Sequence, residues 1–122
     1  MPVPILKQGV VLIASIQAAL TDLDLLQLQD DLAEKVGRFR SRGVIIDVTA
    51  LDVLDSFATR MLRGIAGSAR LRGATTVVVG IQPEVAIALV QLGLSLDGVT
   101  TALDLEEGLE LLGAPSMGAP VR

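Results

Sequence analysis

Residues 42–63 read RGVIIDVTALDVLDSFATRMLR, and this stretch decides the fold. It begins with an apolar run that ends in Asp47, which predicts a buried strand. After a short link, Asp55-Ser56 opens a helical pattern of apolar side chains at Phe57, Met61, Leu62 and Ile65. A helix N-terminus has unpaired N–H groups and the positive end of the dipole. Ser56 is therefore either part of the helix start, as a cap or as a first-turn residue after an Asp55 cap, or a place to hold a phosphate.

The composition of the chain excludes several classes of function. Its 122 residues suit one domain, and 51% of them are hydrophobic, which is enough for one core. The net charge of −4, with two Phe and no Trp or Tyr, argues against a nucleic-acid binder. Without Cys or His there is no disulfide, thiol nucleophile, zinc site or His-dependent triad. We expect no cofactor and no metal.

Neither end of the chain suggests a membrane protein. The N-terminus MPVPILKQG lacks the charged and apolar regions of a signal peptide. No apolar run approaches the roughly 18 residues that span a bilayer. We therefore expect a cytoplasmic protein.

The first half of the chain predicts a hairpin followed by a long helix. Apolar runs at 3–6 and 10–15 flank a turn at 7–9. Thr21 is the expected N-cap of a helix that Gly43 ends. The apolar face of that helix is expected to comprise Leu25, Leu28, Leu32, Val36 and Phe39.

The second half predicts alternating strands and helices. The expected strands are 44–48, 74–79 and 99–101, and the expected helices are 56–71, one from Pro83 to Gly93, and 104–112. The helix after Pro83 has an expected apolar face of Val85, Ala86, Leu89 and Leu92. Residues 1–112 are predicted to form the domain, and the Pro/Gly-rich residues 113–122 a disordered tail.

This order indicates an α/β fold, in which about four helices cover a mixed sheet that opens with a hairpin. The carboxyl ends of parallel strands meet at one edge of such a sheet, and function usually lies there. The residues expected at this edge are Asp47, Asp52, Asp55, Ser56 and Gly80.

A basic stripe is predicted beside Ser56. Arg60, Arg63, Gly67 and Arg70 follow helical spacing, so they are expected to share one solvent-facing side. The stripe is either a solvated helix face or a surface for an acidic partner. Gly64 and Gly67 follow no strand and form no phosphate loop. They are expected to admit the close approach of another backbone.

An alternative use of the edge is a magnesium site for phosphoryl transfer. Asp47, Asp52 and Asp55 could supply its carboxylates, and such an enzyme would lose activity on Asp47→Asn. No lysine is well placed after a later strand to support that chemistry.

Residues 47–56, DVTALDVLDS, resemble the signature of the STAS domains of sulfate transporters and anti-sigma factor antagonists. In that family an apolar strand ends in Asp, a Ser or Thr follows two residues on, and Asp-Ser or Asp-Thr opens the next helix. The resemblance extends from Val3 to about Leu112. Asp55-Ser56-Phe57 and residues 80–86, GIQPEVA, further resemble the RsbS-type antagonists of the bacterial stressosome. Ordinary antagonists more often have a small residue and Gly after the serine.

The resemblance implies a non-catalytic scaffold that controls a stress-response pathway. It implies co-assembly with an RsbR-type STAS protein, capture of a serine/threonine switch kinase, and release of the kinase after phosphorylation. By position the phosphoacceptor is Ser56, and a phosphatase would reset it. The residues expected to support the site or contact a partner are Asp47, Thr49, Asp55, Phe57, Thr59, Arg60 and Arg63.

Two other functions of the same fold remain open at this stage. The chain could bind an anti-sigma-factor kinase directly, without a large complex. It could also be an accessory domain of a transporter, with the serine as a binding residue. A homodimer is plausible in each case.

Overall fold

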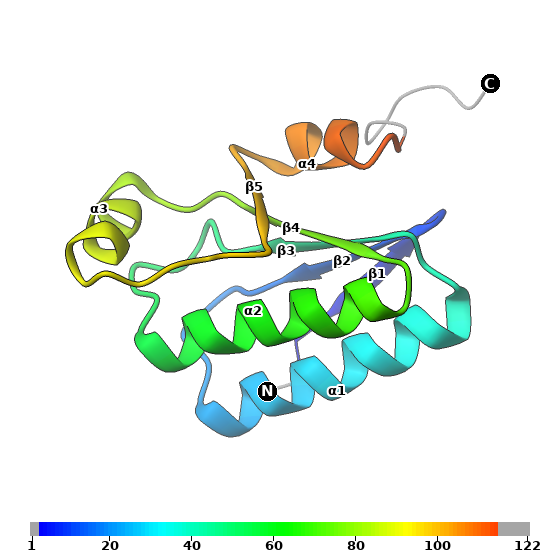
Figure 1. The fold of residues 1–122 in the computed structure, drawn as a ribbon, viewed down its shortest axis with the longest axis horizontal. Helices are drawn as coiled ribbons and strands as arrows, with labels where there is room; N and C mark the ends of the chain where they lie inside the picture. Colours follow the sequence, from blue (N-terminus) through cyan, green and yellow to red (C-terminus); the bar gives the residue numbers. More distant parts are fainter. Residues whose placement is uncertain (1–2, 115–122) are drawn as a thin grey trace.

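A computed structural model describes residues 3–114, which form five strands and four helices (Figure 1). Their order along the chain is β1 (Ile5–Gln8), β2 (Val11–Ser15), α1 (Asp22–Phe39), β3 (Gly43–Asp47), α2 (Ser56–Leu71), β4 (Thr75–Val79), α3 (Pro83–Gln91), β5 (Thr100–Ala102) and α4 (Leu105–Leu111). The strands lie in one sheet in the order β1-β2-β3-β4-β5. The β1–β2 pair is antiparallel and the other three pairs are parallel. The predicted α/β fold with an opening hairpin is confirmed.

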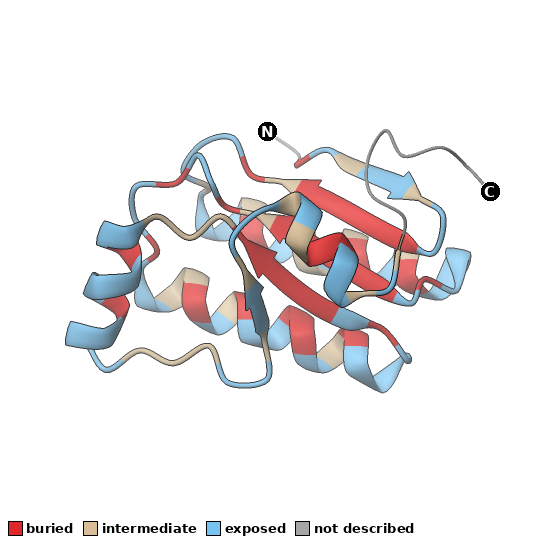
Figure 2. Ribbon diagram, turned by 90° about the horizontal axis from the view of Figure 1, so that it is seen from above, coloured by how far each residue is buried: buried red, intermediate tan, exposed pale blue. Residues whose placement is uncertain are grey.

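The helices cover the two faces of the sheet unequally. Helices α1 and α2 pack side by side on one face, and α4 lies on the other (Figure 1). Strands β2, β3 and β4 are apolar along nearly their whole length because both of their faces are covered (Figure 2). The larger core lies under α1, α2 and α3, and a smaller one lies under α4.

Helix α1 begins as expected and ends earlier. Thr21 and Asp24 form a capping box, and the buried side chains are Leu25, Leu28, Leu32 and Val36. The expected fifth core residue, Phe39, is 36% exposed, with Lys7 and Arg38 over its ring. The helix ends at Arg40, whose φ is 51°, and not at Gly43. Gly43 instead starts β3, where the side chain of Leu112 leaves no space for a Cβ.

Helix α2 has the predicted bounds but a different buried face. The buried residues are Thr59, Leu62, Ile65, Ala66 and Ala69, whereas Phe57 and Met61 are only half-buried. In α3, Val85 and Leu89 are buried, while Ala86 and Leu92 of the expected face are exposed. Helix α3 buries only a narrow strip of its surface, so the apolar residues beside that strip stay exposed.

The remaining boundaries shift by one or two residues. The hairpin turn is at 9–10, because Lys7 and Gln8 belong to β1, and the last strand begins at Thr100. Within the expected tail, the Ala114 N–H donates to the Leu109 carbonyl, and Ala114 packs against the smaller core. Residues 115–122 of that tail lie outside the described part. Among residues 3–114, no helix combines the length and hydropathy that crossing a bilayer requires.

Candidate functional site

The carboxyl edge of the parallel strands carries a clamped loop, residues 48–55. The Asp47 carboxylate accepts hydrogen bonds from the Thr49 N–H, at 2.9 Å, and from the Thr49 hydroxyl, at 2.6 Å. The Gln82 side-chain amide donates to the Thr49 carbonyl at 2.8 Å. Gly80, with φ of 80°, lies against Thr49 so closely that a Cβ would overlap its Oγ1. The end of β3 and the segment after β4 therefore hold Thr49 from both sides.

This arrangement gives Asp47, Thr49 and Gly80 a structural role. Asp47 and Thr49 form an Asx turn. In it the Asp47 carboxylate takes the place of a backbone acceptor at the end of β3. Glycine is required at position 80 by both its φ and its contact with Thr49. The sequence predicted Asp47 and Gly80 at one edge, and the structure places them there, each in contact with Thr49.

The start of α2 separates the two residues of the Asp-Ser pair. Asp55 is the N-cap, and its Oδ1 accepts the Ala58 N–H at 2.7 Å. Ser56 is the first residue of the helix, and its side chain is exposed. The Ser56 hydroxyl makes no hydrogen bond to any residue in the range 3–114. The cap is therefore Asp55, and the serine hydroxyl is left without a hydrogen bond in an exposed residue.

Thr59 lies inside the first turn of α2 and not on the exposed edge. It is 1% exposed, and its Oγ1 donates to the Asp55 carbonyl at 2.8 Å. Of the two roles predicted for Thr59, support of the site or contact with a partner, this buried position is compatible with support, and the role stays a prediction. Its side chain supports the first turn of α2 from inside.

The basic stripe on α2 is exposed, as the spacing predicted. Arg60, Arg63, Gly67 and Arg70 all face solvent. The Arg60 guanidinium lies 6.0 Å from the centre of the Phe57 ring, and Arg70 donates to the Gly98 carbonyl at 2.8 Å. The arginines of the stripe make no ion pair with residues 3–114.

The expected close approach at the α2 glycines is wrong. A Cβ at Gly67 would meet nothing within 4 Å, and one at Gly64 would meet only the side-chain amide of Gln29. Residues 3–114 contain no group of three or more His, Cys, Asp or Glu side chains arranged to hold a metal ion.

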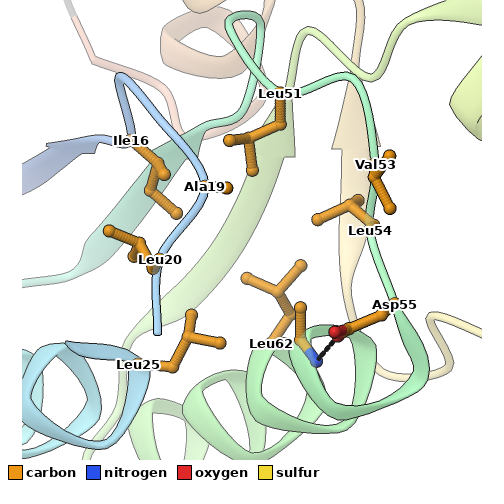
Figure 3. A pocket seen from close by; sticks show the side chains of 10 residues that line it. Ile16, Ala19, Leu20, Leu25, Leu51, Val53, Leu54, Asp55 and Leu62 are labelled. Atoms are coloured by element: carbon orange, nitrogen blue, oxygen red, sulfur yellow. Dashed lines mark hydrogen bonds between the residues drawn. The ribbon is translucent and has the colours of Figure 1, made fainter. Parts of the chain in front are cut away.

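Two apolar hollows flank the start of α2, and the sequence did not predict either. One, of about 110 Å³, lies between the loops that follow β2 and β3 (Figure 3). Its lining includes Ile16, Leu20, Leu25, Leu51, Leu54 and Leu62, with Asp55 at one side. The other, of about 450 Å³, lies between the β3–α2 loop and α3. Its lining includes Ser56 itself, together with Val53, Leu54, Val85, Ala88 and Leu92.

The sequence does hold one signal for these two hollows, which is aliphatic residues placed next to acidic ones in a loop. Val53 and Leu54 lie between Asp52 and Asp55 in a loop, and Val53 is 71% exposed although it is aliphatic. Leu92, at the end of α3, is 70% exposed. Large exposed aliphatic groups around one site are typical of a contact surface.

Comparison with known proteins assigns the fold to a family. The family model of the STAS domain matches residues 3–108 of the sequence. The chain belongs to the STAS-domain family. Among curated relatives, this STAS chain is 32% identical over 84 residues to the RsbT co-antagonist protein RsbRA of Bacillus subtilis. A second relative from that organism, RsbRD, is 25% identical over 80 residues. The matched regions span 31% and 29% of the two relatives' lengths.

Solved structures confirm the RsbS-type resemblance of this STAS chain. A variant of Moorella thermoacetica RsbS has a TM-score of 0.78 and 39% identity, covering 91% of this chain and 94% of that one. A chain in a structure of the stressosome has a TM-score of 0.73 and 38% identity, with coverage of 90% and 96%. The antagonist SpoIIAA, at 12% identity and a TM-score of 0.65, shares the fold. This STAS chain is thus similar to RsbS and to stressosome proteins, and it has the fold of anti-sigma factor antagonists.

Proposed function

We propose that this STAS domain is a non-catalytic scaffold of a stressosome-type complex in the cytoplasm. It holds a serine/threonine switch kinase and releases it when Ser56 is phosphorylated. The observation that carries the proposal is the exposed Ser56 hydroxyl at the start of α2, left unused because Asp55 caps the helix. The similarity to RsbS and to a stressosome chain supports the placement of this domain in a stressosome-type complex.

A phosphate on Ser56 is compatible with the folded domain. It would carry about −1.5 to −2 charges at a helix N-terminus, where free N–H groups and the dipole favour an anion. Asp55 uses the N–H of Ala58, so the N–H groups at the very start of α2 remain for the phosphate. Arg60 lies one turn along and is the nearest cation in sequence. The domain therefore has no need to unfold to be modified.

The same phosphate would oppose a docked partner. Ser56 lines the hollow next to α3, whose other lining residues are mostly apolar. A partner that seats an aliphatic group there would meet a new dianion beside Asp52 and Asp55. Like charge and the desolvation of the phosphate would cost the contact a few kcal/mol, which suffices for release.

The curated relatives support one of the proposed partners. Three curated relatives are described as RsbT co-antagonist proteins of the RsbR group. We propose that an RsbR-type STAS protein co-assembles with this chain, and that a serine/threonine kinase is the captured partner. A phosphatase that removes the Ser56 phosphate completes the cycle.

The first test is intact-mass spectrometry after incubation with ATP and the candidate serine kinase. The wild type is expected to gain one phosphate, about 80 Da, and Ser56→Ala none. Ser68→Ala, which removes a half-buried serine from the same helix, is the matched control and is expected to gain one. An unmodified wild type with an active kinase, or a phosphorylated Ser56→Ala, would contradict the proposal.

The second test separates a large complex from a simple pair. Mixed with an RsbR-type protein, the chain is expected to elute as a particle of megadalton size, and kinase is expected to leave that particle on phosphorylation. Phosphorylation with only a one-to-one kinase complex would indicate a stand-alone antagonist. Absence of both phosphorylation and kinase binding would favour a transport accessory role.

A further inference from the structure

A basic hollow lies at the opposite end of the sheet from Ser56. It has a volume of about 490 Å³ and forms where α1 and α2 end and lead into β3 and β4. Figure 1 shows these two helix ends together, on the side away from α3. The lining residues are Val36, Gly37, Arg40, Ser41, Arg42, Arg72 and Gly73.

Three arginines reach this hollow and no acid does. Arg40, Arg42 and Arg72 are exposed, and the lining contains no Asp or Glu. Within residues 3–114 these three side chains make no ion pair and donate no hydrogen bond. In a chain of net charge −4, three unpaired guanidinium groups around one hollow are a local excess of positive charge.

Two features of the backbone place these side chains. A Cβ at Gly37 would overlap Nη1 of Arg72, so the absence of a side chain lets that guanidinium lie on α1. Arg40 has φ of 51°, and it is the one non-glycine residue in the range 3–114 with positive φ. Glycine or asparagine is the usual residue for this conformation after a helix, and other residues are strained there. The chain keeps a long cationic side chain at a strained position.

A buried hydroxyl completes the lining. Ser41 is 3% exposed, and its Oγ has no hydrogen-bond partner within residues 3–114. Thr76 is the other described residue with such an atom, but it does not line the hollow. A buried hydroxyl without a partner costs free energy, so a bound group that reached Ser41 Oγ after a small shift of the wall would recover a hydrogen bond.

We propose that this hollow binds a compound with several phosphate groups. One planar guanidinium group can donate two parallel hydrogen bonds to phosphate oxygens. Three guanidinium groups together match the charge of a short polyphosphate. The Ser41 hydroxyl would donate to an oxygen at the floor after a small shift. This proposal stands apart from the phosphorylation of Ser56, because the two sites occupy opposite ends of the sheet.

Calorimetric titration with sodium tripolyphosphate at low ionic strength tests the site. Arg72→Gln is expected to weaken binding at least about tenfold, since it removes charged hydrogen bonds. Lys35→Gln removes the same charge from α1 outside the hollow and is expected to change binding less than about twofold. Ser56→Ala is expected to bind as the wild type does.

Two further variants follow from the backbone geometry, and only the first of them leaves every charge in place. Gly37→Ala keeps every cation but displaces the Arg72 guanidinium, so it is expected to weaken binding about threefold or more. Arg40→Gly relieves the strain at φ of 51°, so it is expected to raise the midpoint of thermal unfolding while it weakens binding. A purely structural role for Arg40 would not produce this opposite pair of changes.

Three results would overturn the proposal. One is no tripolyphosphate binding by the wild type at low salt. Another is equal weakening by Lys35→Gln and Arg72→Gln, which would mean that the arginines only offset the dipoles of the two helix ends. The third is that the wild type self-associates and does not bind tripolyphosphate, while Arg40→Gly no longer self-associates. This result would assign the hollow to the acidic surface of a second copy.

Discussion

Asp55 and Ser56 have different tasks at the start of α2. Asp55 caps the helix, and Ser56 presents an exposed side chain. From the sequence, either residue could cap α2, because both types serve as N-caps. The structure gives the cap to Asp55, which bonds the Ala58 N–H, and the outer position to Ser56. Only the backbone conformation at residue 55, φ of −79° and ψ of 177°, separates the two possibilities.

This division predicts the effect of removing the cap. Asp55→Ala is expected to lower the free energy of unfolding by about 1 kcal/mol, because the Ala58 N–H loses its acceptor. Urea denaturation measures the change. Asp52→Ala is the matched control, since Asp52 is exposed and makes no hydrogen bond within residues 3–114, and it is expected to change the value by less than about 0.5 kcal/mol. Equal losses in the two variants would refute the assignment of the cap.

A second carboxylate, Asp24, responds to pH through its capping box. Hydrogen bonding to Thr21 lowers the pKa of Asp24 below its ordinary value of 3.8. Because the folded-state pKa is the lower one, the stabilisation is present above the ordinary pKa and is lost as pH falls through the folded value.

The carboxyl resonance of Asp24 is therefore expected to titrate by NMR with a midpoint below 3.8. The loss of unfolding free energy below about pH 4 is expected to be smaller in Asp24→Asn, which has no such proton to take up. A midpoint at or above 3.8 would show that the capping box does not form in solution.

At the scale of the elements, the sequence was most informative where several signals agreed. Helix α2 has the predicted bounds, because a cap, an apolar period and a following glycine all mark them. The end of α1 was misplaced because Arg40 adopts the left-handed conformation without being glycine. The buried faces of α2 and α3 were misjudged because periodicity shows which residues share a side, but not how wide the contact is.

Two helical glycines have opposite roles, and alanine substitution distinguishes them. A Cβ at Gly67 on α2 would meet nothing within 4 Å, so Gly67→Ala is expected to raise the free energy of unfolding by about 0.5–1 kcal/mol. On α4, a Cβ at Gly108 would lie 2.9 Å from Cγ1 of Val79 and 3.3 Å from Cδ1 of Ile45. Gly108→Ala is therefore expected to lower it by about 1–3 kcal/mol.

Thermal or urea unfolding of both variants measures this difference, with the wild type as reference. Stabilisation by Gly108→Ala would mean that α4 lies farther from the sheet than the contact with Val79 indicates. Destabilisation by Gly67→Ala would point to a neighbour at that surface in solution.

At the scale of the whole molecule, the candidate site was predictable in part. Edge residues such as Asp47 and Gly80 could be grouped in advance, since parallel strands bring their carboxyl ends together. The hollows beside Ser56 and between the helix ends could not, because they depend on how far neighbouring loops and helices stand apart. Arg40, Arg42 and Arg72 come from two segments whose proximity only the folded chain shows.

Unequal coverage of the sheet predicts unequal local stability. Strands β3 and β4 are buried on both faces, whereas α3 contributes only Val85 and Leu89 to the core. Hydrogen-exchange mass spectrometry is expected to find α3 exchanging first and β3 last among the elements. Slow exchange in α3 of the isolated chain would indicate that something covers its exposed aliphatic residues, as in a self-associated form.

The strand order has a consequence for synthesis. Each strand of the sheet pairs with the one that comes just before it in the chain. As the nascent polypeptide leaves the ribosome, every new strand therefore finds its neighbour already made, and the sheet can grow from one edge without waiting for distant segments. The last addition is β5 with α4, which closes the smaller core, so a chain halted before residue 100 would expose the β4 edge and the uncovered face to its neighbours.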